Sequence, residues 1–407
     1  MYPQELIDEI LDNLHDSSSA LKACSLVSHQ FYPRTRDYLF RCVDCPHPDE
    51  ARIFDIARDS PELLRCIKRV QFRCLDFFLP QYQTATCEIL HSLPSPMTLS
   101  FWADRVEVSH STEECEWPQI LPALMSSAPY LAVTRLELKG PQWCTFLEFH
   151  HIILSFPNLT ELYILGMRHL IVYGGSVIMP ASPAPRIKKM CMGGCISIPA
   201  FWEGLRSYRS VYLDHLEEFY AINFSPDEFC AIVQAANIVS NGLKVVEITC
   251  SCIPIWNFPG LSPNVSPLHL NATADLRLGG HLNDRMLPFI NWWIKCFQAF
   301  EKESTIMERL TIKLGDWGSP VPPGQLEPLK RAFEELSDLL SRLVRNVDLV
   351  FQLKDYYAHP DLSVDCLRGA IVDACKVLKK TNSRAFDMTE RTPDVPVFPF
   401  PASTRIF

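Results

Sequence analysis

The chain has 407 residues, of which 47% are hydrophobic and 21% are charged, and its net charge is −9. These proportions are typical of a globular protein, and the length suffices for one large domain or two to three ordinary ones. The negative charge argues against a nucleic-acid-binding protein, which needs a basic face. No run of about 18 apolar residues indicates a membrane span, and Glu5, Asp8 and Glu9 do not suit a signal peptide. We therefore expect a protein of the cytoplasm, the nucleus or both.

Residues 1–43 carry the clearest pattern, three short stretches that are each apolar on one side. Five apolar residues share one face of the first expected helix: Leu6, Ile7, Ile10, Leu11 and Leu14. A break at 16–19 supplies an N-cap for a second helix over 20–31, and Pro33 ends that helix or opens a third. Helices of about 7–12 residues are too short to be stable alone. Their apolar surface must be covered by another protein or by the rest of this chain.

In order and spacing, "PQELIDEILDNL" and "ALKACSLVSHQFYPRTRDYLFRCV" resemble the F-box of fungal F-box proteins. The family pattern is roughly L-P-x-E-[IL]-[IL]-x-x-I-[LF]-x-x-L, a spacer, L-x-x-[AC]-x-x-V-[CS]-[KRH]-x-[WF] and a closing L-[WF]-R. Tyr2 stands where the family has Leu, and Phe31 where it has Trp. The resemblance implies docking on the Skp adaptor of SCF (Skp–cullin–F-box) ubiquitin ligases. The residues implied to contact the adaptor are Pro3, Leu6, Ile7, Ile10, Leu11, Leu14, Leu21, Cys24, Leu26, Val27, Phe31, Leu39 and Phe40.

The rest of the chain alternates strand-like and helix-like stretches with a period of about 23 to about 38 residues, typical of a leucine-rich-repeat-like (LRR-like) solenoid. Strands are predicted at 67–72, 97–101, 133–138, 159–165, 186–192, 210–213, 243–248, 274–278, 308–314 and 345–351. Helices are predicted at 145–159, 227–240, 324–344 and 364–380. This region resembles the irregular LRR-like C-terminal regions of other fungal F-box proteins. A non-repetitive α/β domain is the alternative.

We expect an α+β or α/β fold, in which a small helical F-box precedes an irregular strand–helix solenoid. The expected organisation is an F-box over 1–43, a connecting segment over 44–66, an LRR-like domain over 67–380 and a Pro-rich flexible tail over 381–407. Six tryptophans are predicted near loops or element ends, where they are candidates for target contacts: Trp143, Trp202, Trp256, Trp292, Trp293 and Trp317.

The sequence contains no common catalytic motif. It lacks the phosphate-binding G-x-x-x-x-G-K-[ST] and G-x-G-x-x-G patterns, the zinc-protease H-E-x-x-H and the nucleophile elbow G-x-S-x-G. Cys42 and Cys45 with His47 form half of a zinc site, but no second half follows at a suitable spacing. Most of the 16 cysteines lie in apolar segments and are expected as core thiols. We predict no catalytic residue, no cofactor and no metal.

The predicted function is a non-enzymatic substrate-recognition subunit of an SCF-type E3 ubiquitin ligase. The F-box would bind the Skp adaptor and through it a cullin, and the C-terminal region would hold a target protein near the ligase. No nucleic acid and no membrane is expected as a partner. The alternatives are an F-box scaffold without ligase function, an enzyme with scattered site residues, and helices that pack on the rest of their own chain. Aspartate at Ile10 or Leu11 is predicted to abolish adaptor binding and to leave the C-terminal region folded.

Overall fold

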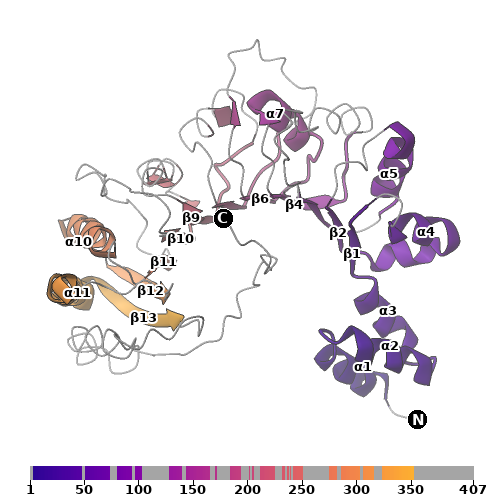
Figure 1. Cartoon of the computed structure of the whole chain (residues 1–407), viewed down its shortest axis with the longest axis horizontal. Helices are drawn as coiled ribbons and strands as arrows, with labels where there is room; N and C mark the ends of the chain where they lie inside the picture. The colour runs from indigo at the N-terminus through magenta and orange to yellow at the C-terminus, as the bar shows by residue number, and fades with distance from the viewer. Residues whose placement is uncertain are drawn as a thin grey trace. The chain divides into compact units, whose positions relative to one another are not determined.

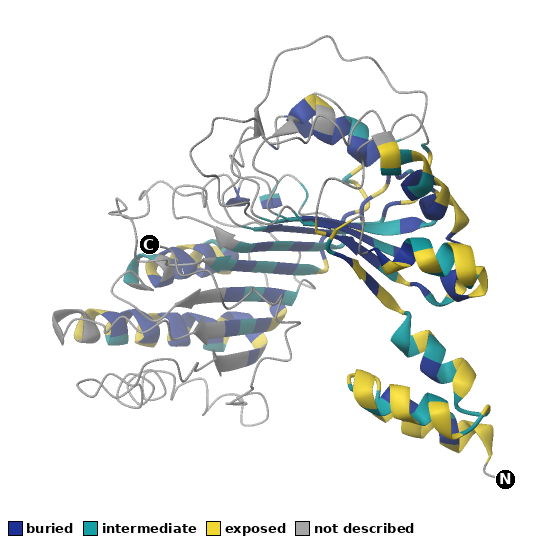
Figure 2. Ribbon diagram, turned by 45° about the vertical axis from the view of Figure 1, so that its right-hand side comes forward, coloured by how far each residue is buried: buried dark blue, intermediate teal, exposed yellow. Residues whose placement is uncertain are grey.

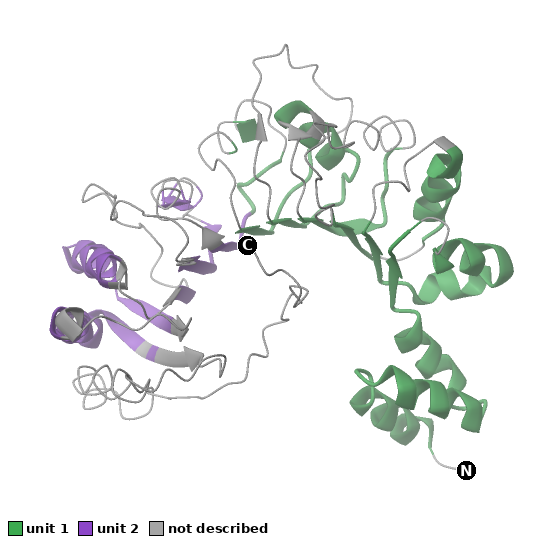
Figure 3. Ribbon diagram, in the orientation of Figure 1, with its two compact units in different colours: residues 1–215 green, residues 216–407 purple. Residues whose placement is uncertain are grey.

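The computed structural model combines helices with parallel strands, an α/β structure (Figure 1), and divides into two compact units, Met1–His215 and Leu216–Phe407 (Figure 3). The described residues are 3–47, 51–73, 80–93, 97–102, 128–139, 144–165, 170–171, 184–193, 201, 204–205, 211–224, 232–233, 236–237, 239, 242–250, 275–281, 286–302, 306–315 and 323–352. The helix predicted at 364–380 and the tail over 381–407 lie outside these residues.

The first unit begins with three short helices: α1 (Gln4–Asn13), α2 (Ser18–Val27) and α3 (Tyr32–Leu39). Ser17 caps α2, because its Oγ accepts a hydrogen bond of 3.3 Å from the amide of Ala20. The second helix ends at Val27 and not at Phe31, since Ser28 takes an extended backbone conformation. Pro33 lies in the first turn of α3, where its missing N–H costs nothing, so it opens the third helix.

The strands of the first unit follow one another in chain order, and each pairs with the next in parallel. They are β1 (Cys42–Cys45), β2 (Arg69–Phe72), β3 (Met97–Trp102), β4 (Val133–Lys139), β6 (Glu161–Leu165) and β8 (Lys189–Gly193), while β5 (Cys144–Thr145) pairs with β7 (Leu170–Ile171). The connections contain α4 (Arg52–Asp59), the 3-10 helix η2 (Pro61–Cys66), α5 (Pro80–Ser92) and α7 (Phe146–Leu154).

Register explains the core of this unit, because alternate side chains of a strand point to opposite faces. Five residues paired across β2, β3, β4, β6 and β8 form one continuous row, and each is 0% exposed: Val70, Leu99, Leu136, Leu162 and Met190. A second row beside it runs from Phe72 and Phe101, whose rings stack 5.8 Å apart, to Met192. The helices α4, α5 and α7 follow this apolar face (Figure 1).

The second unit repeats the same plan with β9 (Glu218–Phe224), β10 (Val245–Cys250), β11 (Asp275–His281), β12 (Met307–Gly315) and β13 (Val344–Gln352), again parallel and in chain order. Its core row is Phe219, Val246, Leu276, Leu310 and Val347, all at most 3% exposed. The helices α10 (Met286–Lys302) and α11 (Pro323–Leu343) pack against each other.

Most predicted strands overlap an observed one, but three features differ. Of the strand predicted at 210–213, the described residues 211–213 form only a single bridge, from Tyr212 to Arg186. The segment 44–66, predicted as a connection, contains the second half of β1 together with α4 and η2. Trp292 and Trp293, predicted near an element end, lie inside α10 and are 4% and 2% exposed, so packing in the core accounts for them. The other four tryptophans singled out lie outside the described residues.

In the part of the chain that the structure describes, none of the helices has the length and the apolar character needed to cross a membrane.

Replacing Leu136 by Ala should lower the free energy of unfolding by about 2–5 kcal/mol, because it removes methyl groups from the centre of the buried row. The matched control is Leu131→Ala, at a position that is 61% exposed, for which we expect a change within about 0.5 kcal/mol. Urea denaturation of the full chain measures both, and equal losses would contradict the assignment of the core.

Candidate functional site

The three N-terminal helices form a small core of their own. Ile7, Leu11 and Leu21 are 3%, 0% and 1% exposed, and five partly buried residues pack against them: Leu14, Cys24, Phe31, Tyr38 and Leu39. The core draws on all three helices. The three helices therefore cover part of their apolar surface by themselves.

A polar clamp fixes α1 against α3. The guanidinium of Arg34 donates two hydrogen bonds, of 2.8 and 2.9 Å, to the two carboxylate oxygens of Asp12. The hydroxyl of Tyr38 donates a third, of 2.7 Å, to the same carboxylate. The hydrogen bonds from Tyr38 and Arg34 lower the pKa of Asp12, so the carboxylate stays ionised well below neutral pH. The clamp makes the arrangement of the helices specific.

Much of the surface of α1, α2 and α3 is exposed (Figure 2). Among the described residues of these helices, five of the exposed ones are large and apolar. They are Leu6 (49%) and Ile10 (54%) on α1, Leu26 (87%) and Val27 (74%) at the end of α2, and Tyr32 (40%) at the start of α3. We call them the exposed apolar set. The side-chain amide of Gln4 donates a 3.2 Å hydrogen bond to the carbonyl of Gln30, which brings the start of α1 beside the turn that follows α2.

The structure divides the apolar face predicted for α1 into buried and exposed residues. Ile7 and Leu11 point into the core, while Leu6 and Ile10, one residue earlier in each turn, point outward. The predicted adaptor-binding residues accordingly fall into three groups. Ile7, Leu11 and Leu21 are buried; Leu14, Cys24, Phe31, Leu39 and Phe40 are partly buried; and Pro3, Leu6, Ile10, Leu26 and Val27 are exposed. Ile7, Leu11 and Leu21 therefore hold the three helices together beneath the exposed residues.

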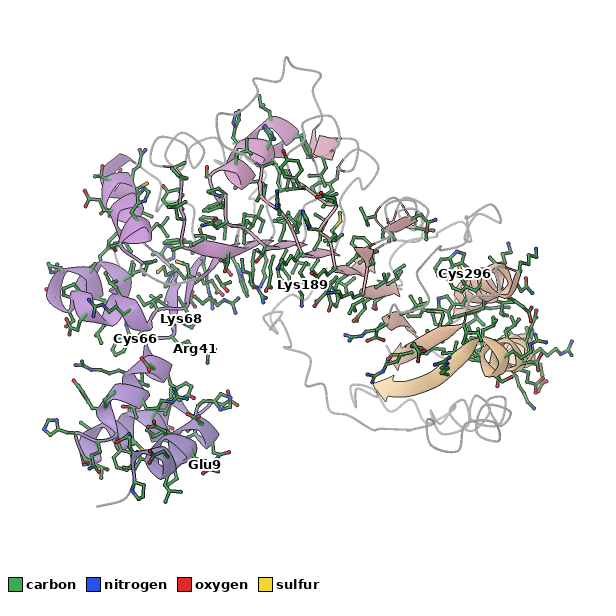
Figure 4. All side chains as sticks on the ribbon, turned by 180° about the vertical axis from the view of Figure 1, so that it is seen from behind. Glu9, Arg41, Cys66, Lys68, Lys189 and Cys296 are labelled. Carbon is green, nitrogen blue, oxygen red and sulfur yellow. The ribbon has the colours of Figure 1, made fainter. Side chains whose placement is uncertain are left out.

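The helices join the strands at the end of α3. The carbonyl of Arg41 accepts hydrogen bonds from the amides of Lys68 and Arg69, both 2.9 Å long, and α3 packs against η2. Cys66 also lies at this junction, where burial and a hydrogen bond with Asp37 raise the pKa of its thiol. Figure 4 shows Arg41, Cys66 and Lys68 gathered here and Glu9 among the helices. The junction leaves the exposed apolar set uncovered.

The half-site suggested by Cys42 and Cys45 lies on β1. Residues three apart on a strand point to opposite faces, and accordingly Cys42 is exposed while Cys45 is 0% exposed. Burial raises the pKa of Cys45 to about 12, which keeps its thiol protonated at neutral pH and makes it a poor metal ligand. Within the described ranges, no three His, Cys, Asp or Glu side chains come together in a way that could hold a metal ion.

A second surface lies on the face of the first unit's strands opposite the apolar rows, and we call it the polar strand face. Among its residues are Asp44, Arg69, Gln71, Ser100, Trp102, Arg135, Glu137, Lys139, Glu161, Tyr163 and Lys189, together with Arg73, which directly follows β2. Figure 4 shows Lys189 among the side chains that project from this face, away from α7.

Glu137 is the centre of the polar strand face. Its carboxylate is 0% exposed and lies 2.9 Å from the guanidinium of Arg69, 2.7 Å from that of Arg135 and 3.0 Å from the ammonium of Lys139. The hydroxyl of Ser100 donates a 2.8 Å hydrogen bond to it. Burial alone would raise the pKa of Glu137, but the three cations and the hydroxyl outweigh burial and lower it. A buried carboxylate is thus ionised and fully enclosed by donors.

Two aromatic rings on this face contact cations. The guanidinium of Arg135 lies 4.0 Å from the ring centre of Tyr163, and the ammonium of Lys139 lies 4.2 Å from that of Trp102. Arg73 lies 5.5 Å from the same indole and also pairs with Asp44 at 2.6 Å. These contacts hold long basic side chains against the strands.

Comparisons with known proteins assign no family to this chain. No family model matches it, and no curated protein is similar to it in sequence. The function is therefore argued from the two surfaces themselves.

Replacing Glu137 by Gln should destabilise the first unit at pH 7, because it leaves the three cations without their shared counter-charge. Breaking a buried ion pair costs about 3–5 kcal/mol; because the side chains of Arg69 and Arg135 are 34% and 30% exposed, solvent screening should bring the loss to about 3 kcal/mol or less. The folded pKa lies below the unfolded value near 4.5. The contribution of Glu137 is therefore complete above that pH and disappears as the pH falls through the folded value.

Urea denaturation between pH 7 and about pH 3 measures this difference, which should shrink with acid. Asp59→Asn is the matched control, since Asp59 is 62% exposed and pairs only at the surface with Arg58. A difference that stays constant over this pH range would contradict the role given to the charge of Glu137.

Proposed function

We propose that this chain is a substrate-recognition subunit of an SCF-type ubiquitin ligase. In this proposal the exposed apolar set docks on the Skp adaptor, through which a cullin is bound, and the strand units hold a target protein. One observation carries the proposal: the N-terminal helices complete a core of their own and still expose Leu6, Ile10, Leu26 and Val27.

The energetics support a docking role for these residues. A monomeric protein exposes single apolar residues often, but several of them on one small unit are typical of an interaction site. Fully burying an aliphatic side chain contributes about 1.5–3 kcal/mol, so four such residues offer several kcal/mol toward association before its entropic costs. The rival in which the helices pack on their own chain is not favoured, because these side chains are exposed with the whole chain present.

The strand order supports the LRR-like solenoid as the target-binding part. Within each unit, the strands of the main sheet lie in the order in which they occur along the chain, and each pairs in parallel with the one that follows it. A doubly wound α/β sheet reverses its strand order part-way, whereas a solenoid adds one repeat after another. The monotonic order within each unit therefore favours repeats over the non-repetitive alternative. Such a chain would act by proximity, since it raises the concentration of the target near the ligase.

Replacing Ile10 or Leu26 by Asp should weaken binding to purified Skp adaptor by about tenfold or more, because each change places a carboxylate in the apolar interface. Both positions are exposed, so the helices should stay folded and circular dichroism should not change. Leu131→Asp, at a residue that is exposed in the same unit, is the matched control and should bind normally. Undiminished binding of both interface variants would rule the proposal out.

Leu11→Asp tests a different property and separates folding from docking. Leu11 is 0% exposed, so an aspartate there should unfold the helices and abolish binding indirectly, with increased proteolysis of residues 1–43.

A separate experiment mixes the full chain, without substitutions, with adaptor and cullin together. Recovery of adaptor without cullin would identify a scaffold without ligase function, and recovery of both supports the ligase subunit.

A further inference from the structure

The polar strand face carries a charge opposite to that of the chain. Five basic residues, Arg69, Arg73, Arg135, Lys139 and Lys189, face three acidic ones, Asp44, Glu137 and Glu161, which leaves a net charge of +2 among the described residues of this face. The whole chain has a net charge of −9. A local excess of positive charge on an acidic protein indicates a surface that attracts anions.

The basic side chains crowd one another at the centre of the face. Arg69, Arg135 and Lys139 share the carboxylate of Glu137, and Arg135 also pairs with Glu161 at 3.4 Å. Burial lowers the pKa of Lys139, and the charges of Arg69 and Arg135 lower it further, against the attraction of Glu137. An additional carboxylate brought to this cluster would relieve the repulsion among the three cations.

The face also has more hydrogen-bond donors than acceptors. The Nε of Arg69 and the indole Nε1 of Trp102 are buried and have no acceptor in the described part of the chain. The side chains of Arg69 and Arg135 nevertheless remain 34% and 30% exposed, so their outer nitrogens can reach a ligand. Carboxylates satisfy such donors well, since each accepts several charge-assisted hydrogen bonds.

We propose that the polar strand face binds an acidic, carboxylate-rich segment of the target protein. The inference deepens the proposed function, from which it takes the role of this unit as target holder. A nucleic acid fits less well, because a continuous phosphate backbone needs a more strongly basic face than a net charge of +2 provides. An extended peptide of about ten residues spans roughly 30 Å, enough to cross several strands about 4.8 Å apart.

The test uses the full chain and a fluorescein-labelled oligoglutamate peptide of about ten residues, with binding measured by fluorescence anisotropy. We expect saturable binding that weakens as sodium chloride is raised, because the contacts are electrostatic. Lys189→Glu and Arg73→Glu, at opposite ends of the face, should each weaken binding by about fivefold or more. The matched control is Arg58→Glu, which makes the same charge change on the exposed side of α4 and should leave the affinity unchanged.

Three results would overturn the proposal. The first is no saturable binding of oligoglutamate, and the second is an equal loss for Arg58→Glu, which would show attraction by overall charge alone. The third is tighter binding of a single-stranded oligonucleotide of the same charge, which would make the face a nucleic-acid site. The Ile10→Asp variant should bind the peptide normally, and Lys189→Glu should bind the adaptor normally. Failure of this inference is therefore distinct from failure of the proposed docking function.

Discussion

The arrangement of the N-terminal helices depends on how many apolar residues a three-helix unit of this size can enclose. Helix α1 carries two adjacent apolar rows, Ile7 with Leu11 and Leu6 with Ile10, and only the first fits between α2 and α3. The Asp12–Arg34–Tyr38 clamp fixes the orientation of α1, so the helix cannot rotate to bury the second row without breaking three hydrogen bonds. The exposed apolar set is thus a direct consequence of the packing within the unit.

The strands of the first unit follow a similar rule. Their apolar face is covered by helices, and their opposite face is left with an excess of positive charge. Parallel register places apolar rows against the helices, and the charged residues of β2 and β4 then fall on the opposite face. Glu137 can be buried there only because three cations surround it, and the same cations give the face its positive charge. Stability and the proposed attraction of an acidic ligand therefore involve the same side chains at the centre of the face, so the variants at its margins, Lys189 and Arg73, are better suited to separate the two.

Periodicity predicts the elements whose apolar pattern is strong. It fails where contacts with neighbouring elements decide which residues are buried. The strand over 133–138 reads as alternating apolar residues and is observed almost unchanged as β4. The short β1 was missed because its four residues alternate too briefly to be recognised, and so the F-box boundary predicted at 43 cuts through it. Helix α10 was missed although its exposed residues Asn291, Lys295, Gln298 and Lys302 recur at helical spacing. The division of the α1 residues into inner and outer rows depends on α2 and α3, which a single-helix pattern does not contain.

Arg69 links the two surfaces physically. Its backbone amide donates to the carbonyl of Arg41, where α3 ends, and its guanidinium pairs with Glu137 at the centre of the polar strand face. Transfer of ubiquitin by proximity requires that a bound target keeps a limited range of positions relative to the adaptor, because effective concentration falls as a linker grows longer and looser. In the proposed function, a direct hydrogen-bonded connection at residues 41 and 69 serves this purpose better than a flexible linker, because the backbone amides of Lys68 and Arg69 both donate to the carbonyl of Arg41.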